Sequence, residues 1–149
     1  MILVDTNVFV YAINQDAPQH TASRALIEAV QTGDLPCTLV PQILLEFFAI
    51  VTNGRRVARP LDTAMALDQI RVLQSIFPVR DVCREALSHL PRVLEEQTRI
   101  RGGGVFDAWL VAQMLAMDIN RICTYNGTDF LGYDVIRPVT PEELVQVSS

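Results

Sequence analysis

The chain has 149 residues, of which 50% are apolar and 19% charged, and its formal net charge is −5. This length fits a single domain, which we expect to span residues 1–149, and the apolar content excludes a disordered chain. The negative charge argues against a protein that holds nucleic acid by bulk electrostatics, so a role on nucleic acid would have to rest on local clusters of basic residues.

Apolar runs and the spacing of apolar residues predict strands that alternate with helices. In chain order the expected elements are a strand at 2–4, a helix from 6, a helix at 20–30, a strand at 37–40, a helix at 41–52, a helix from about 62, a strand at 77–79, a helix at 81–96, a helix at 106–117, a strand at 121–124, an edge strand at 135–136 and a short helix from 141. Pro91 predicts a kink or a break in the helix that contains it.

Short strands that are apolar on both faces and separated by helices indicate a mostly parallel sheet with helices on both sides. The expected fold class is therefore α/β. In such sheets, ligands gather beyond the carboxyl ends of the strands. Asp5 and Asp129 both follow predicted strands, so they lie where this rule places chemistry.

Membrane, disulfide and zinc proteins do not fit the sequence. The longest apolar stretches, such as residues 43–51, are short and interrupted by Glu46, and the first residues lack the basic flank of a secretory signal. We expect a soluble, cytoplasmic protein without a membrane partner. The three cysteines lack CxxC spacing and are expected to be buried reduced thiols, and the two histidines are isolated in predicted helices.

Glu46 is an acid in the middle of a predicted helix that has apolar residues on every side. Burying an ionised carboxylate without a partner costs several kcal/mol. A carboxylate in such a position is therefore expected to have a function that offsets this cost. The alternative is that Glu46 lies on a narrow solvated stripe or pairs with an arginine. We favour a functional role.

Three further acids each have an ordinary explanation when taken alone. Asp5 or Asp107 could cap a helix, and Asp129 could be a turn residue. Carboxylates that converge from distant parts of a chain repel one another, and a bound cation compensates for that repulsion. Ligation by oxygen alone favours Mg²⁺ or Mn²⁺ over zinc.

Four stretches of the sequence together resemble the PIN-domain ribonucleases, and the match covers essentially the whole chain. These stretches are Val4-Asp5-Thr6-Asn7, Leu45-Glu46-Phe47, Phe106-Asp107-Ala108-Trp109-Leu110-Val111-Ala112 and Thr124-Tyr125-Asn126-Gly127-Thr128-Asp129-Phe130. The length is that of the VapC-type toxins of bacterial type II toxin-antitoxin modules.

The resemblance implies a three-layer αβα sandwich with a short, mostly parallel central sheet. It also implies Mg²⁺- or Mn²⁺-dependent endonucleolytic cleavage of RNA, a homodimer, and a cognate antitoxin that blocks the acidic groove. Such a toxin would inhibit translation or growth. Single-stranded or looped RNA is the substrate expected from the family.

Each of the four acids has an expected role in a two-metal mechanism of phosphodiester hydrolysis. We expect Asp5 to bridge the ions and Asp107 to complete that site. Glu46 would orient the attacking water or hold the metal, and Asp129 would bind a second, weaker ion.

The neighbours of these acids match the family pattern with one departure. Thr6, Asn7 and Thr124 match family positions that hydrogen-bond and orient the acids. Members often carry an acid where Asn126 stands, so the fourth carboxylate is expected from Asp129.

All twelve basic residues are arginine, and some of them cluster. The planar guanidinium donates two parallel hydrogen bonds to a phosphate, which makes arginine the better phosphate clamp. The candidate RNA-binding residues are Arg55, Arg56, Arg59, Arg99 and Arg101.

Three other functions compete with the ribonuclease. An aspartyl-phosphate phosphatase needs a second aspartate two residues after the first, where this chain has Asn7, and it usually uses a lysine. A phospho-receiver domain also requires that lysine, and the chain has none. The third is a catalytically silent PIN-like scaffold that only binds a partner, which the retained acids argue against.

Overall fold

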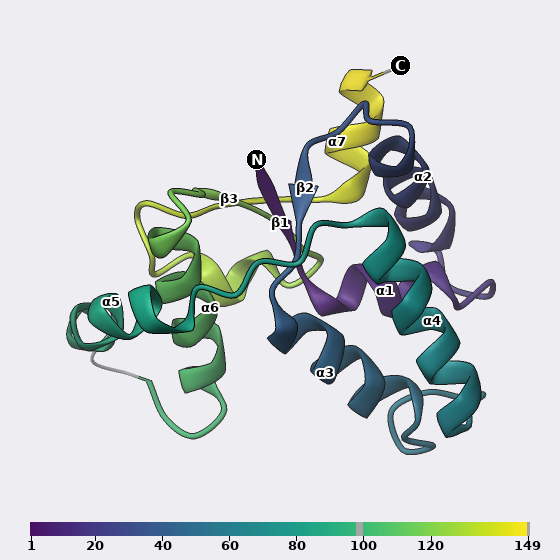
Figure 1. The fold of residues 1–149 in the computed structure, drawn as a ribbon, viewed down its shortest axis with the longest axis horizontal. Helices are drawn as coiled ribbons and strands as arrows, with labels where there is room; N and C mark the ends of the chain where they lie inside the picture. The colour runs from purple at the N-terminus through teal and green to yellow at the C-terminus, as the bar shows by residue number, and fades with distance from the viewer. Residues whose placement is uncertain (98–99, 149) are drawn as a thin grey trace.

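The computed structural model describes residues 1–97 and 100–148 (Figure 1). In chain order the elements are β1 (Ile2–Val4), α1 (Thr6–Ala12), α2 (His20–Gln31), β2 (Cys37–Thr38), α3 (Pro41–Val51), α4 (Thr63–Ile76), α5 (Cys83–Glu96), α6 (Gly104–Ala116), β3 (Arg121–Cys123), the 3₁₀ helix η1 (Gly127–Phe130), β4 (Arg137–Val139) and α7 (Pro141–Ser148).

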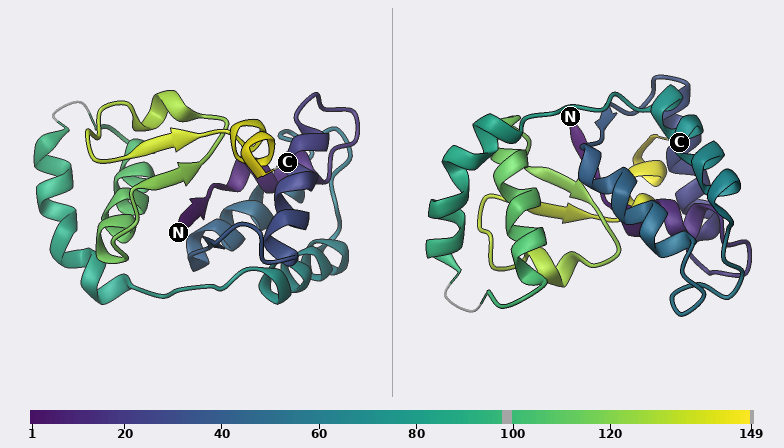
Figure 2. Two further views of the ribbon diagram at one scale, coloured as in Figure 1. Left: turned by 90° about the horizontal axis from the view of Figure 1, so that it is seen from above. Right: turned by 60° about the horizontal axis from the view of Figure 1, so that its bottom comes forward.

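The four strands form one parallel sheet in the order β2-β1-β3-β4. Ile2 of β1 lies opposite Cys37 of β2 and Arg121 of β3. On the far side of β3, Cys123 lies opposite Val139 of β4. Figures 1 and 2 show α5 and α6 together to one side of the sheet and α1 to α4 to the other. The α/β class expected from the sequence is confirmed, and every strand pair of the sheet is parallel.

The central strand β1 is fully buried because layers of helix flank it. Ile2, Leu3 and Val4 are at most 1% exposed. A strand buried on both faces has a continuous apolar run in place of alternation, which is the pattern of these three residues. The residue that follows them, Asp5, is the first polar group after the core, so the fold places it at the carboxyl edge of the sheet.

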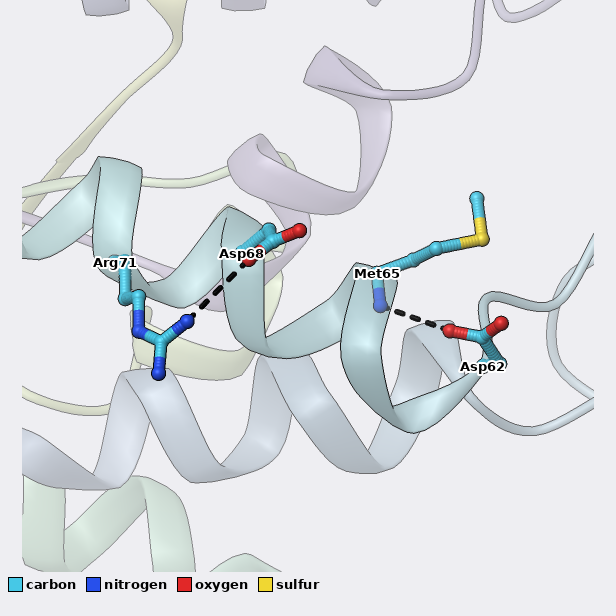
Figure 3. Close-up of polar contacts among 4 residues, drawn as sticks. All are labelled: Asp62, Met65, Asp68 and Arg71. Carbon is cyan, nitrogen blue, oxygen red and sulfur yellow. Dashed lines mark hydrogen bonds and ion pairs between the residues drawn. The ribbon is translucent and has the colours of Figure 1, made fainter.

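Helix α4 begins at the expected place. The side chain of Asp62 accepts a hydrogen bond of 2.8 Å from the backbone N–H of Met65, which satisfies one of the unpaired donors of the first turn (Figure 3). One turn further on, the exposed side chains of Asp68 and Arg71 form a surface pair 3.5 Å apart (Figure 3).

Two expected strands differ from the structure. Residues 77–79 form a single parallel bridge, between Leu39 and Val79, and no strand. Here the carbonyl of Pro78 accepts the N–H of Leu39, but a proline has no N–H to continue a ladder. The last strand begins at Arg137, one residue beyond the expected pair 135–136.

Helix α5 continues through Pro91, so of the two expected outcomes, a kink or a break, the break is wrong. A proline within a helix leaves the carbonyl four residues earlier without its donor. That carbonyl belongs to Leu87, and both Leu87 and Pro91 are exposed, so water can take the place of the missing donor.

The cysteines are all free thiols, and two of them, Cys37 and Cys123, are buried as expected. Cys83 is exposed at the start of α5, so the expectation of burial is wrong for that residue. None of the helices in the described part of the chain combines the length and the apolar character that crossing a bilayer requires.

Candidate active site

Asp5 lies at the end of β1 and is the N-cap of α1. Its backbone N–H donates to the carbonyl of Cys123 in β3, at 2.9 Å, so the sheet fixes its position. Its backbone is extended, and the Oδ1 atom accepts a hydrogen bond of 2.8 Å from the backbone N–H of Thr6. Asp5 is therefore both a helix cap, through Oδ1, and a candidate functional residue.

The second oxygen of Asp5 is held by the loop that follows β3. The Thr124 hydroxyl donates to Oδ2 of Asp5 at 2.8 Å, and the Asn7 amide donates to the same oxygen at 3.3 Å and to Oγ1 of Thr124 at 3.1 Å. The side-chain Oδ1 atom of Asn7 accepts a hydrogen bond of 3.0 Å from the backbone N–H of Tyr125. Thr124 is 1% exposed. These bonds connect the carboxyl ends of β1 and β3 through side chains.

Glu46 comes from the middle of α3 and is half-buried. The hydroxyl of Thr6, itself buried, donates to Oε2 of Glu46 at 2.9 Å. The Oε1 atom accepts a hydrogen bond of 2.8 Å from the side-chain amide of Gln42, one turn earlier in the helix. Thr6 thus contacts both acids, with its backbone on Asp5 and its hydroxyl on Glu46.

Asp107 lies in the first turn of α6 and is half-buried. Within the described residues its carboxylate accepts no hydrogen bond. Its pKa is raised from 3.8 to about 6, mostly by burial and then by the charges of Asp129, Asp5 and Glu46, in that order. All four acids are therefore close enough for their charges to interact, although they come from four separate parts of the chain.

Asp129 is exposed on η1, and its negative charge raises the pKa values of both Asp5 and Asp107. Asn126, which precedes η1, donates its backbone N–H to the Thr124 hydroxyl at 3.0 Å, and its carbonyl accepts the N–H of Asp129 at 3.0 Å. Its side chain is exposed. The backbone of Asn126 thereby supports the loop that carries Asp129.

The four carboxylates repel one another, and this repulsion is unfavourable unless a positive charge lies near them. Burial raises the pKa of Asp5, hydrogen bonds from Thr124 and Thr6 lower it, and the charges of Glu46 and Asp129 raise it again. No arginine of the described residues acts on the pKa of Asp5 or Asp107.

The donor chemistry fits a hard divalent cation, since every acid offers oxygen only and the cluster needs positive charge. In residues 1–97 and 100–148, no three acidic, histidine or cysteine side chains already lie close enough together to hold one ion.

The candidate RNA-binding arginines that the structure describes are all exposed. Arg55, Arg56 and Arg59 are exposed in the loop between α3 and α4, where Arg59 lies 3.9 Å from Asp16. Arg101 is exposed just before α6. Arg99 falls outside the described residues.

Two glutamines that were not singled out from the sequence belong to the hydrogen-bond network around Glu46. Gln42 donates to Glu46, and Gln113 of α6 donates to Oε1 of Gln42 at 2.9 Å. Gln113 is 4% exposed and lies in a helix of apolar residues. The signal that drew attention to Glu46, a polar side chain inside an apolar helix, applies equally to Gln113.

Comparison with known proteins decides the family of the chain. A family model described as "PIN domain" matches residues 2–135, a range that contains all four acids. The chain belongs to the PIN-domain family.

Relatives within the PIN-domain family include VapC proteins of Mycobacterium tuberculosis. The chain is 30% identical over 118 residues to Ribonuclease VapC43, which covers 77% of this chain and 79% of that protein. It is 28% identical over 152 residues to Ribonuclease VapC24, a match that covers 95% of this chain and 99% of that protein. A solved toxin-antitoxin complex from Klebsiella pneumoniae has a chain of the same fold, with a TM-score of 0.63 and 15% identity over 95% of this chain and 98% of that chain.

Proposed function

We propose that this PIN-domain protein is a divalent-metal-dependent ribonuclease and the toxin of a toxin-antitoxin pair. The observation that carries the proposal is the arrangement around Asp5 and Glu46. Both oxygens of each carboxylate accept hydrogen bonds, and Thr6 bonds to both acids. Carboxylates held in fixed positions at the carboxyl edge of a parallel sheet suit a metal-dependent hydrolase. The relatives named as ribonucleases support RNA as the substrate.

The proposed cation is Mg²⁺ or Mn²⁺, because both prefer carboxylate oxygens and neither needs histidine or cysteine. Asp5, Asp107 and Glu46 would hold it, and Asp129 would be the ligand of a second, weaker ion. When bound, a divalent cation neutralises charge on the phosphate and makes water a stronger nucleophile.

The protein's own side chains supply orientation. Hydrolysis forms a bond from a water oxygen to phosphorus and breaks the bond from phosphorus to the leaving ester oxygen. Glu46, whose two oxygens are anchored by Thr6 and Gln42, would orient that water. Thr124 and Asn7 would keep the Oδ2 atom of Asp5 in one position throughout the reaction. Fixed geometry of this kind lowers the barrier by positioning.

The remaining expectations complete the proposal. The exposed arginines Arg55, Arg56 and Arg59, with Arg101 before α6, would hold the RNA backbone around an acidic site. The fold neighbour from a toxin-antitoxin complex supports a cognate antitoxin as protein partner, and the family expectation is a homodimer. We propose that residues 1–149 act as one domain.

Expression of the chain alone in bacteria, followed by mapping of new RNA ends, tests toxicity, chemistry and target together. We expect growth arrest and discrete new RNA ends with the wild type, and neither with Asp5→Asn. A wild-type protein that is made, folded and harmless, and that produces no new ends, would instead support the silent partner-binding scaffold.

A further inference from the structure

A chain of side-chain amides runs from Glu46 into the interior of α6. The Gln42 amide nitrogen donates to Oε1 of Glu46 at 2.8 Å and to the backbone carbonyl of Phe106 at 3.3 Å. The Gln113 amide nitrogen donates to Oε1 of Gln42 at 2.9 Å and to the backbone carbonyl of Trp109 at 3.4 Å. We refer to Gln42 and Gln113 as the amide relay.

The hydrogen bonds of the relay allow only one orientation of each amide. An ionised Glu46 and the carbonyl of Phe106 can only accept, so Gln42 must turn its NH₂ group toward them. Its carbonyl oxygen then faces Gln113 and needs a donor there. Because Gln113 also faces the carbonyl of Trp109, its own NH₂ group must point to both acceptors. Neither amide can flip without placing oxygen against oxygen.

The relay joins the two helices that carry Glu46 and Asp107. Gln42 lies in α3 one turn before Glu46, and its second acceptor, Phe106, is the residue directly before Asp107 in α6. Gln113 belongs to the same helix as Asp107. The relay therefore fixes the side chain of one acid relative to the backbone next to another.

Burial makes the inner end of the relay costly unless it is bonded. Gln113 is 4% exposed, and transferring an amide out of water without a hydrogen bond costs about 1–3 kcal/mol. No buried side-chain nitrogen or oxygen in the described part of the chain lacks a hydrogen-bond partner, so the buried polar atoms of the relay are all paired. An apolar residue of the same length would fill this position without that cost, so an amide there suggests a role beyond packing.

We propose that Gln42 and Gln113 are positioning residues that hold Glu46 in the orientation needed to bind the divalent cation. This inference rests on the proposed metal-dependent function, and the relay acts through Glu46 without touching the cation itself. Side chains that hydrogen-bond to metal ligands orient them, and their loss typically weakens metal binding or activity about 10- to 100-fold.

The test measures Mn²⁺ binding to metal-free protein in the absence of RNA, by the electron paramagnetic resonance signal of free Mn²⁺. Gln42→Met and Gln113→Met are nearly isosteric and remove only the hydrogen bonds. The matched control is Gln74→Met, at an exposed position of α4. Urea unfolding in EDTA, measured on each variant, separates an effect on the fold from an effect on metal binding. Gln113→Asn, whose shorter amide cannot reach Gln42, replaces Gln113→Met should the latter fail to fold.

We expect Gln42→Met to weaken Mn²⁺ binding about 10-fold or more, and Gln113→Met about 3-fold or more, with Gln74→Met unchanged. The double variant should bind Mn²⁺ as Gln42→Met does, because Gln113 acts only through Gln42. Wild-type affinity in either single variant would overturn the inference. So would a double variant whose loss equals the product of the two single losses.

The same titration distinguishes failure of the inference from failure of the proposed function. A wild-type protein that binds no Mn²⁺ would overturn the metal-dependent function together with the relay. Mn²⁺ binding by the wild type with no change in the relay variants would overturn the relay alone. Loss of unfolding free energy in EDTA at unchanged Mn²⁺ affinity would show that the glutamines serve only to join α3 to α6.

Discussion

Asp107→Asn should make the metal-free protein more stable, although it removes a residue of the candidate active site. In the folded protein, burial and three neighbouring acids raise the pKa of Asp107 from 3.8 to about 6. Above pH 6 the ionised carboxylate is therefore held in the folded state at a cost that the unfolded chain does not carry. Asparagine keeps the shape of the side chain and removes the charge.

The size of the effect follows from the shift in pKa. A rise from 3.8 to about 6 corresponds to at most about 3 kcal/mol. Asp107 is only half-buried, so solvent screening reduces this figure, and the helix N-terminus favours a negative charge by about 0.3–1 kcal/mol. We expect a net gain of about 1–2 kcal/mol at pH 7.5, or about 2–8 °C in Tm for a domain of this size.

The stability difference between the wild type and Asp107→Asn should depend on pH. A folded-state pKa above the unfolded value means that the folded state binds the proton more tightly. The wild type is therefore relatively stable below about pH 4 and loses stability as the pH rises to about 6. The advantage of Asp107→Asn should be present at pH 7.5 and largely absent at pH 4.

Thermal unfolding in EDTA at both pH values measures this difference. Asp68→Asn, which changes an exposed acid of the pair in Figure 3, is the control and should change stability by no more than about 0.5 kcal/mol at either pH. Added Mn²⁺ should reverse the order, because an ion at 100 times its Kd stabilises the protein that binds it by about 2.7 kcal/mol. An Asp107→Asn protein that is less stable than the wild type in EDTA at pH 7.5 would refute the reasoning.

Three further predictions concern single side chains. Thr124→Val removes the hydroxyl that donates to Asp5 and should cost about 1–3 kcal/mol in urea unfolding and weaken Mn²⁺ binding, whereas Thr124→Ser should retain both. Asp62→Ala removes a helix cap and should cost about 1 kcal/mol in the same assay while leaving Mn²⁺ affinity unchanged; a shift in that affinity would contradict it. Of the three cysteines, only Cys83 should react with a thiol reagent in the native protein, as mass spectrometry would show, because the other two are buried.

The sequence predicted the α/β class and the positions of most helices because apolar residues recur at the period of each element. The sequence prediction was wrong for two short strands that contain or adjoin a proline. Residues 77–79 have the composition of a strand, but Pro78 offers only its carbonyl to the neighbouring chain. The strand β4 begins at the exposed Arg137 followed by a proline, and neither residue type favours a strand.

The candidate acids were predictable to different degrees for physical reasons. Glu46 was visible as a charge inside an apolar helix, and Asp5 as the first polar residue after a buried strand. Their coupling through Thr6 required the packing of α1 against α3, which no local pattern specifies. Gln42 and Gln113 lie 71 residues apart, so only the tertiary structure brings their amides together.

The most direct test of the proposed activity is cleavage of a mixture of cellular RNAs by purified protein, with the wild type and Asp5→Asn compared in EDTA and with added Mn²⁺. We expect cleavage only by the wild type and only with the metal, because Asp5 would hold the cation and is itself fixed by Thr6, Asn7 and Thr124. Cleavage by Asp5→Asn at the wild-type rate, or cleavage by the wild type in EDTA, would contradict the proposed mechanism.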